Sequence, residues 1–147
     1  VPLAELGDIA DTFQRVRVAL RDAVLAGTPA EVAVVRARSD SLDRQLDSLA
    51  RVYEATILSD SMRAEFAAFR QARGAFVPLR DSALALAAAD EDSAALALIR
   101  GAAYEAQVPV VEAIHAMQTL KVSHAAARAD ANAVLADRAQ VMILSLT

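Results

Sequence analysis

Apolar residues recur every seven positions through most of the chain, in two neighbouring rows. In the first such segment, one row consists of Leu6, Phe13 and Leu20. A spacing of seven residues corresponds to about two turns of an α-helix, so each row would form a stripe along a helix that packs against others. The pattern predicts helices over residues 3–26, 30–57, 61–87 and 92–144.

The boundary between the first two helices is the clearest local signal. In the sequence AGTPAE, Gly27 suits the end of one helix, while Thr28 and Pro29 suit the cap and the first position of the next. Glu31 stands three residues after Thr28, which completes a capping box. The later boundaries are LSDSM near residue 60 and AADEDS near residue 90, where acidic residues suit a helix N-terminus.

Short loops between long amphipathic helices make consecutive helices antiparallel neighbours. The sequence therefore predicts an all-α protein, an antiparallel up-down-up-down four-helix bundle with long first and fourth helices. Pro109 lies inside the fourth predicted helix. Because proline removes a backbone donor and crowds the preceding turn, we expect a kink there.

The fourth helix keeps its heptads to the end and adds roughly 40 Å beyond the length of the others, at about 1.5 Å per residue. This excess predicts that the first helix begins earlier in a longer protein. The terminal run VMILSLT is unusually apolar and predicts a helix that enters a membrane. We therefore expect a fragment of a larger receptor, with flanking transmembrane helices outside this chain. The alternative is a soluble bundle with an apolar end.

Composition narrows the classes of function. The 147 residues include no cysteine, and the formal net charge is -4. The absence of cysteine excludes a disulfide scaffold and a thiolate metal site. The acidic balance, with arginine interleaved among acids, argues against binding to nucleic acid.

Only one pair of residues has the spacing of a metal site. Glu112 and His115 match half of a bundle di-iron motif, but the motif has no second copy. His115 and His124 are nine residues apart, so they face opposite sides of a helix, and we expect His124, which falls in a heptad row, to line the seam and His115 to face solvent. Without a catalytic motif or a complete ligand set, the sequence predicts no enzyme, no metal and no cofactor.

Four stretches carry a further signal: VPLAELGDIADTFQRVR, LDSLARVYEATILSDSMRAEFAAFRQARGAF, LALAAADEDSAALALIRG and HAMQTLKVSHAAARADANAVLADRA. Together they resemble the four-helix-bundle sensor domain of bacterial methyl-accepting chemotaxis receptors. The resemblance implies a periplasmic (extracytoplasmic) domain of an inner-membrane protein. It also implies a homodimer packed through the first and last helices, a small-molecule ligand, and a small displacement of the last helix as the signal.

Similar bundles also precede histidine kinases and cyclic-dinucleotide enzymes, so the output of the receptor stays open. A structural or interaction bundle that binds no small molecule is a further alternative. A ligand that binds only the folded protein would distinguish the two classes, because it raises the melting temperature by mass action.

Polar residues at a common height predict a cavity two to three turns below one end of the bundle. They are Arg17, Ser39, Arg80, Arg100, Tyr104 and Gln107. Guanidinium groups in a partly dry cavity favour a carboxylate, because each can donate paired, charge-assisted hydrogen bonds. We therefore expect an organic acid or amino acid as ligand, with Arg17 and Arg80 as anchors and Tyr104 as a lid or donor.

The alternative is that these arginines pair with acids on neighbouring helices. Arg73 and Arg80 fall in a row of the third helix that a bundle normally buries. An unpaired charge there would be costly, and Asp43 and Asp47 of the second helix are the candidate partners.

Overall fold

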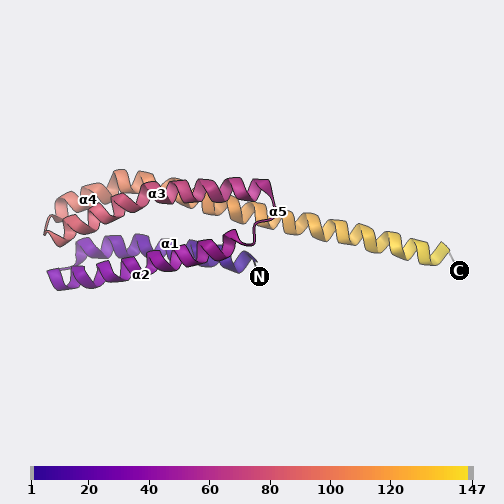
Figure 1. Cartoon of the computed structure of the whole chain (residues 1–147), viewed down its shortest axis with the longest axis horizontal. Helices are drawn as coiled ribbons and strands as arrows, with labels where there is room; N and C mark the ends of the chain where they lie inside the picture. Colours follow the sequence, from indigo (N-terminus) through magenta and orange to yellow (C-terminus); the bar gives the residue numbers. More distant parts are fainter. Residues whose placement is uncertain (1, 146–147) are drawn as a thin grey trace.

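The computed structural model describes residues 2–145, with side chains from residue 3 to residue 141. The helices of this part are α1 (Pro2–Leu25), α2 (Pro29–Glu54), α3 (Asp60–Ala88), α4 (Asp92–Arg100) and α5 (Ala102–Ser145). α4 and α5 together form the fourth arm of an antiparallel bundle, and α5 then continues far past the other helices (Figure 1). The predicted all-α four-helix bundle is confirmed.

The first helix boundaries follow the capping residues of the sequence. Thr28 Oγ1 accepts a hydrogen bond from the amide of Glu31 at 3.2 Å, and the Glu31 carboxylate accepts one from the amide of Gly27 at 2.8 Å. At the start of α3, Ser59 Oγ accepts a hydrogen bond from the amide of Met62 at 3.2 Å. Local chemistry therefore sets where α2 and α3 begin.

The fourth arm differs from the single helix expected over residues 92–144. α4 ends at Arg100 and α5 begins at Ala102, and Gly101 between them has φ −103° and ψ −109°. The amide of Gly101 closes the last bond of α4 and its carbonyl accepts the first bond of α5, so the helical hydrogen-bond ladder is interrupted. A glycine inside a helix costs about 1 kcal/mol relative to alanine, which makes it a favourable place for a break. Pro109, where a kink was expected, lies inside the continuous helix α5.

The helices associate as two hairpins. α1 packs mainly on α2, whereas α3 packs on α4 and α5 (Figure 1). The hairpins meet along two lines: the α1–α5 seam, where α1 contacts α4 and α5, and the α2–α3 seam, where α2 contacts α3. Between these seams α1 also contacts α3, and the rings of Phe13 and Phe76 lie edge to face with centroids 5.3 Å apart.

The heptad rows supply the core of the bundle but lose this role in α5 after residue 121. The most deeply buried side chains include Leu6, Phe13, Tyr53, Phe69, Phe76 and Met117. In contrast, every residue from 122 to 141 is exposed, His124 included, because no helix of the described chain lies beside this part of α5 (Figure 1). This exposed segment is called the α5 tail below.

Within residues 2–145, none of the helices combines the length and apolar character that crossing a membrane requires. The predicted entry into a membrane rests on the run VMILSLT, and all of its side chains except that of Val141 lie outside the described part. That prediction stays untested.

Candidate functional site

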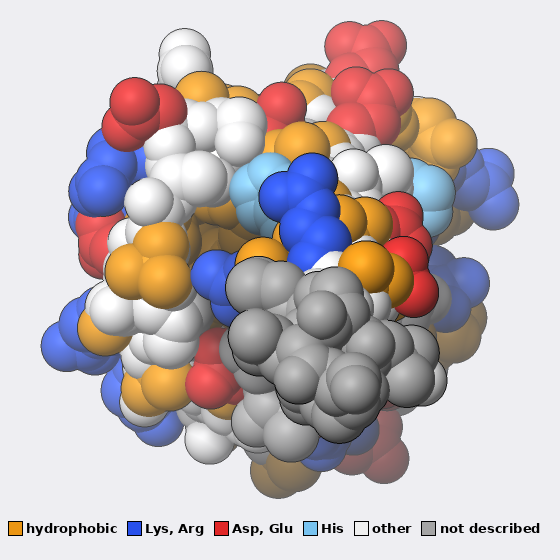
Figure 2. Space-filling model, turned by 90° about the vertical axis from the view of Figure 1, so that its right-hand side faces the viewer, with side chains coloured by type: hydrophobic (Ala, Val, Ile, Leu, Met, Phe, Trp, Pro, Cys, Tyr) orange, Lys and Arg blue, Asp and Glu red, His pale blue; other side chains and the backbone are white. Residues whose placement is uncertain are grey.

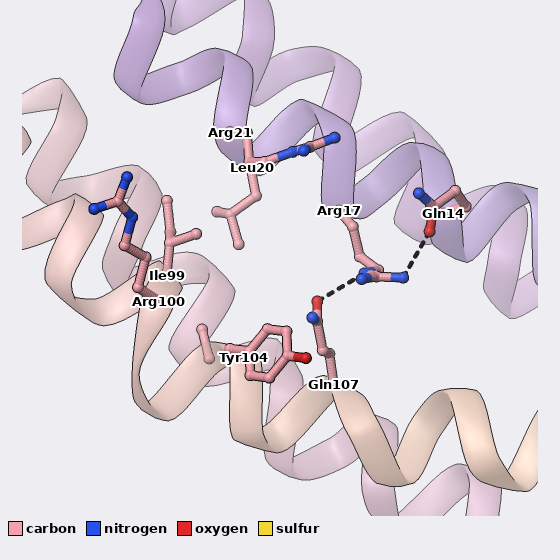
Figure 3. Close-up of a pocket in the computed structure, with 9 residues that line it drawn as sticks. Gln14, Arg17, Leu20, Arg21, Ile99, Arg100, Tyr104 and Gln107 are labelled. Carbon is pink, nitrogen blue, oxygen red and sulfur yellow. Dashed lines mark hydrogen bonds between the residues drawn. The ribbon is translucent and has the colours of Figure 1, made fainter.

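A cavity of about 420 Å³ opens at the α1–α5 seam, beside the break at Gly101 (Figure 3). Its lining consists of Gln14, Arg17, Leu20 and Arg21 from α1, Ile99 and Arg100 from α4, and Ala103, Tyr104 and Gln107 from α5. Four of the six predicted site residues therefore line one cavity: Arg17, Arg100, Tyr104 and Gln107.

Arg17 bridges the two sides of this cavity. Its Nε donates to Gln107 Oε1 at 2.7 Å, and its Nη1 donates to Gln14 Oε1 at 2.7 Å. In Figure 3 the side chains of Arg17 and Gln107 point toward one another from α1 and α5. Both acceptors are neutral amides, and a guanidinium has five N–H donors, so donors remain for a further acceptor.

Two more guanidinium groups make the cavity strongly cationic. Arg21 lies one turn after Arg17, and Arg100 lies across the cavity at the end of α4 (Figure 3). Within the described part of the chain, no carboxylate oxygen forms an ion pair within 4.0 Å of any of these three. The C-terminal end of α4 and the N-terminal end of α5 meet here with opposite dipole ends, so the positive potential comes from the guanidinium groups.

The cationic lining contrasts with the end of the bundle from which the α5 tail extends. On the face seen along α5 from its C-terminal end, acidic and basic side chains are interspersed (Figure 2). The cavity has no acidic lining residue, and its floor is apolar because Leu20, Ile99 and Ala103 contribute to it. Tyr104 is 53% exposed, and its hydroxyl points toward Gln107 (Figure 3). The arrangement can therefore hold a small anion with an apolar part.

The structure places Ser39 and Arg80 away from this cavity. Arg80 is only 4% exposed, and its Nε and Nη2 donate to Asp81 Oδ1 at 2.9 and 2.6 Å. Its Nη1 lies 2.9 Å from Asp43 Oδ1, in an ion pair whose angle does not give a hydrogen bond. Ser39 is fully buried and its Oγ has no partner. Counting helical turns gives the position of a residue along the bundle axis, but it does not show which seam the side chain faces.

Arg73 forms the centre of an ion-pair cluster at the α2–α3 seam. Its Nη2 lies 2.7 Å from Asp43 Oδ1, and its Nη1 donates to Asp47 Oδ1, so the two predicted partners are confirmed. The hydrogen bond from Arg73 lowers the pKa of the Asp47 carboxyl. Burial acts to lower the pKa of Arg73, but its bonds to Asp47 and Asp43 raise it overall.

A second cavity, of about 570 Å³, lies beside this cluster at the α2–α3 seam. Its charged lining residues are Asp43, Asp47, Arg51, Glu54, Arg70 and Arg73. Acids and arginines are thus matched here, and Arg70 Nη1 also lies 3.4 Å from Glu54 Oε1. This cavity offers no unmatched charge to a ligand.

The model of a family described as a four-helix-bundle sensory module for signal transduction matches residues 1–136. The chain belongs to this family. A comparison with curated proteins finds no match. In this sensory module, the cationic cavity lies between the first helix and the helix that continues into the α5 tail.

Two polar residues of the cavity lining, Gln14 and Arg21, were not among the predicted site residues. Gln14 and Arg21 lie three residues before and four residues after Arg17. These spacings place all three on one face of α1, so helical periodicity around Arg17 could have found them.

The described residues of the sensory module contain no group of three or more His, Cys, Asp or Glu side chains placed to hold a metal ion. His115 and His124 are both exposed on α5. The cavity itself presents guanidinium, amide and phenol groups, which bind anions rather than metal cations.

Proposed function

We propose that this sensory module binds a small carboxylate-bearing ligand, an organic acid or an amino acid, in the cavity at the α1–α5 seam. One observation carries the proposal: Arg17, Arg21 and Arg100 line a single cavity and form no ion pair with the described acids. The chain has 19 acidic residues against 15 lysines and arginines, so acids are not scarce. Their absence from this lining leaves a charge that an anion can neutralise.

Each lining residue has a role that follows from its chemistry. Arg17 is partly buried and would bind the carboxylate through paired hydrogen bonds, which are strong where water is partly excluded. Arg21 and Arg100 are exposed and would add attraction at the mouth. Tyr104 would donate or accept a hydrogen bond at the edge of the cavity. Ser39 and Arg80 have no part in this proposal because they do not line the cavity.

The receptor context is also part of the proposal. The module would be the periplasmic domain of a bacterial transmembrane chemoreceptor that works as a homodimer and signals through its last helix. Support comes from α5, which lines the cavity through Tyr104 and Gln107 and then continues as the α5 tail. A histidine kinase or a cyclic-dinucleotide enzyme with the same sensor could receive the signal through the same helix.

A bundle that recruits a partner helix and binds no small molecule is the second candidate. The α5 tail favours it, because Val122, Val134 and Leu135 are 51% to 62% exposed. A protein that binds no small molecule would show no change in melting temperature with any metabolite, whereas a ligand of the folded state raises it.

Calorimetric titration with succinate, citrate, aspartate and benzoate tests the proposal. We expect at least one of them to bind the wild type, and Arg17→Ala to weaken it at least about tenfold, as loss of a charged hydrogen bond implies. Arg36→Ala is the matched control, because Arg36 is exposed on α2, which does not contact α4 or α5 in the described structure. Equal affinity of the wild type and Arg17→Ala, or no binding at all, would contradict the proposal.

A further inference from the structure

In the described structure, one side-chain hydrogen bond joins α1 to α5, and it runs from Arg17 Nε to Gln107 Oε1 at 2.7 Å. Both residues are partly buried and line the cationic cavity. We infer that Gln107 holds the place of the ligand carboxylate on Arg17, and that an incoming anion displaces it. This inference rests on the proposed function and adds the competitor that the ligand must replace.

The donors of Arg17 show at which edge a carboxylate must displace an amide. A carboxylate binds a guanidinium most strongly through two parallel N–H donors, either Nε with Nη2 or Nη1 with Nη2. Gln107 occupies Nε, and Gln14 occupies Nη1. Nε has a single hydrogen, so paired binding at the edge formed by Nε and Nη2 replaces the amide oxygen of Gln107, whereas Nη1 has a second hydrogen that Gln14 leaves free.

Gln107 is the one displaced. Gln14 is exposed and bonds Arg17 within the same helix, at a separation of three residues. Gln107 instead crosses the seam and faces Arg17 over the cavity (Figure 3). An anion inside the cavity meets the edge of Arg17 that Gln107 occupies, and a carboxylate is a stronger acceptor for a guanidinium than a neutral amide.

At the α2–α3 seam, by contrast, an added anion gains nothing by displacing the partners of the arginine. Arg73 is bound by the carboxylates of Asp43 and Asp47, so an added anion would have to replace a charged partner with another of the same kind. At the α1–α5 seam the acceptor is neutral, so the exchange favours the ligand. The nature of the acceptor, amide or carboxylate, separates a seam that responds to anions from one that does not.

Displacement also changes how α1 is tied to α5. In this structure the two helices are joined directly, by the hydrogen bond from Arg17 to Gln107. With an anion bound, α5 loses this bond just after the interruption at Gly101, where the ladder between α4 and α5 is already broken. The first turns of α5 can therefore adjust without the cost of breaking a continuous helix.

Two substitutions of Gln107 separate a competitor from a direct ligand contact. Gln107→Glu supplies an internal carboxylate, so it should raise the melting temperature without ligand and weaken citrate or succinate binding at least about tenfold. Gln107→Met keeps the length of the side chain but lacks the amide acceptor, so it should bind the same anion severalfold more tightly than the wild type. Gln45→Glu adds the same charge on exposed α2, away from the fourth arm, and should change neither quantity.

Three outcomes would overturn the inference. Unchanged anion affinity in Gln107→Glu would show that Gln107 does not compete, and weakened affinity in both Gln107 variants would show that it binds the ligand itself. In both cases the proposed function would stand. If neither citrate nor succinate binds the wild type, the inference fails, and the remaining carboxylates of the titration panel decide the proposed function.

Discussion

At the α2–α3 seam, the guanidinium of Arg73 lies between the carboxylates of Asp43 and Asp47; at the α1–α5 seam, that of Arg17 lies between the amides of Gln14 and Gln107. The two arginines occupy similar positions, each on the line where the two hairpins meet. The first is neutralised by its own chain and the second is not. The difference teaches that burial of an arginine in a bundle does not by itself point to a ligand, and the proposal for Arg17 rests on its place in a cavity without a carboxylate partner.

The largest expected effect is a contrast in stability between the two seams. Asp43→Ala removes a carboxylate that both Arg73 and Arg80 contact, and both side chains are at most 13% exposed. Breaking a buried ion pair costs about 3 kcal/mol or more, because the cations lose their partner. Gln107→Ala also removes one acceptor of an arginine, but the loss of a hydrogen bond to a neutral group costs only about 1 kcal/mol.

Urea unfolding of both alanine variants measures this contrast. The free energies of unfolding are compared when the variants have the same dependence of that free energy on urea concentration. Asp40→Ala serves as the control on α2, because Asp40 forms no ion pair within the described part of the chain. If Asp43→Ala and Gln107→Ala lower the free energy of unfolding equally, the charged and the neutral partners of the seam arginines do not differ in their contribution to stability.

The smaller effect is a pH dependence at the α2–α3 seam. The hydrogen bond from Arg73 holds the pKa of Asp47 below its ordinary value of 3.8. The stabilisation is therefore present above the unfolded pKa and is lost as the pH falls through the lower folded pKa. Because the Asp47 side chain is 49% exposed, we expect this contribution to be no more than about 1 kcal/mol.

Acid titration of stability measures the contribution. Below about pH 4, the free energy of unfolding should fall more steeply in the wild type than in Asp47→Asn, which cannot lose a charge. Asp40→Asn should keep the wild-type slope. An Asp47→Asn protein with the same acid dependence as the wild type would show that the Arg73 pair does not stabilise the seam.

The repeat of seven residues was sufficient to predict most of the fold. It selected core residues such as Leu6 and Phe13, which are almost completely buried. It failed at His124, because burial of a heptad position needs a neighbouring helix and the described chain has none beside the α5 tail. It also did not predict the break at Gly101, because the apolar rows continue across this residue although the helical backbone is interrupted there.

The candidate site was predicted in part for a related reason. Arg17, Tyr104 and Gln107 were placed together because they lie at one height on helices that are neighbours in the bundle. Arg80 was placed with them wrongly, because the same height is shared by two seams and a heptad row does not say which seam a long side chain enters. Its contacts with Asp43 and Asp81 settle the matter, and only the packed structure shows them.

The central claim is that Arg17 lacks a carboxylate which a ligand supplies. A crystal structure of the protein grown with citrate tests it most directly. The account predicts a carboxylate group bound to Arg17 through two N–H donors, with the Gln107 amide turned away and the Arg73 cluster unchanged. Citrate at the α2–α3 seam, or an empty cavity in which Arg17 still donates to Gln107, would contradict it.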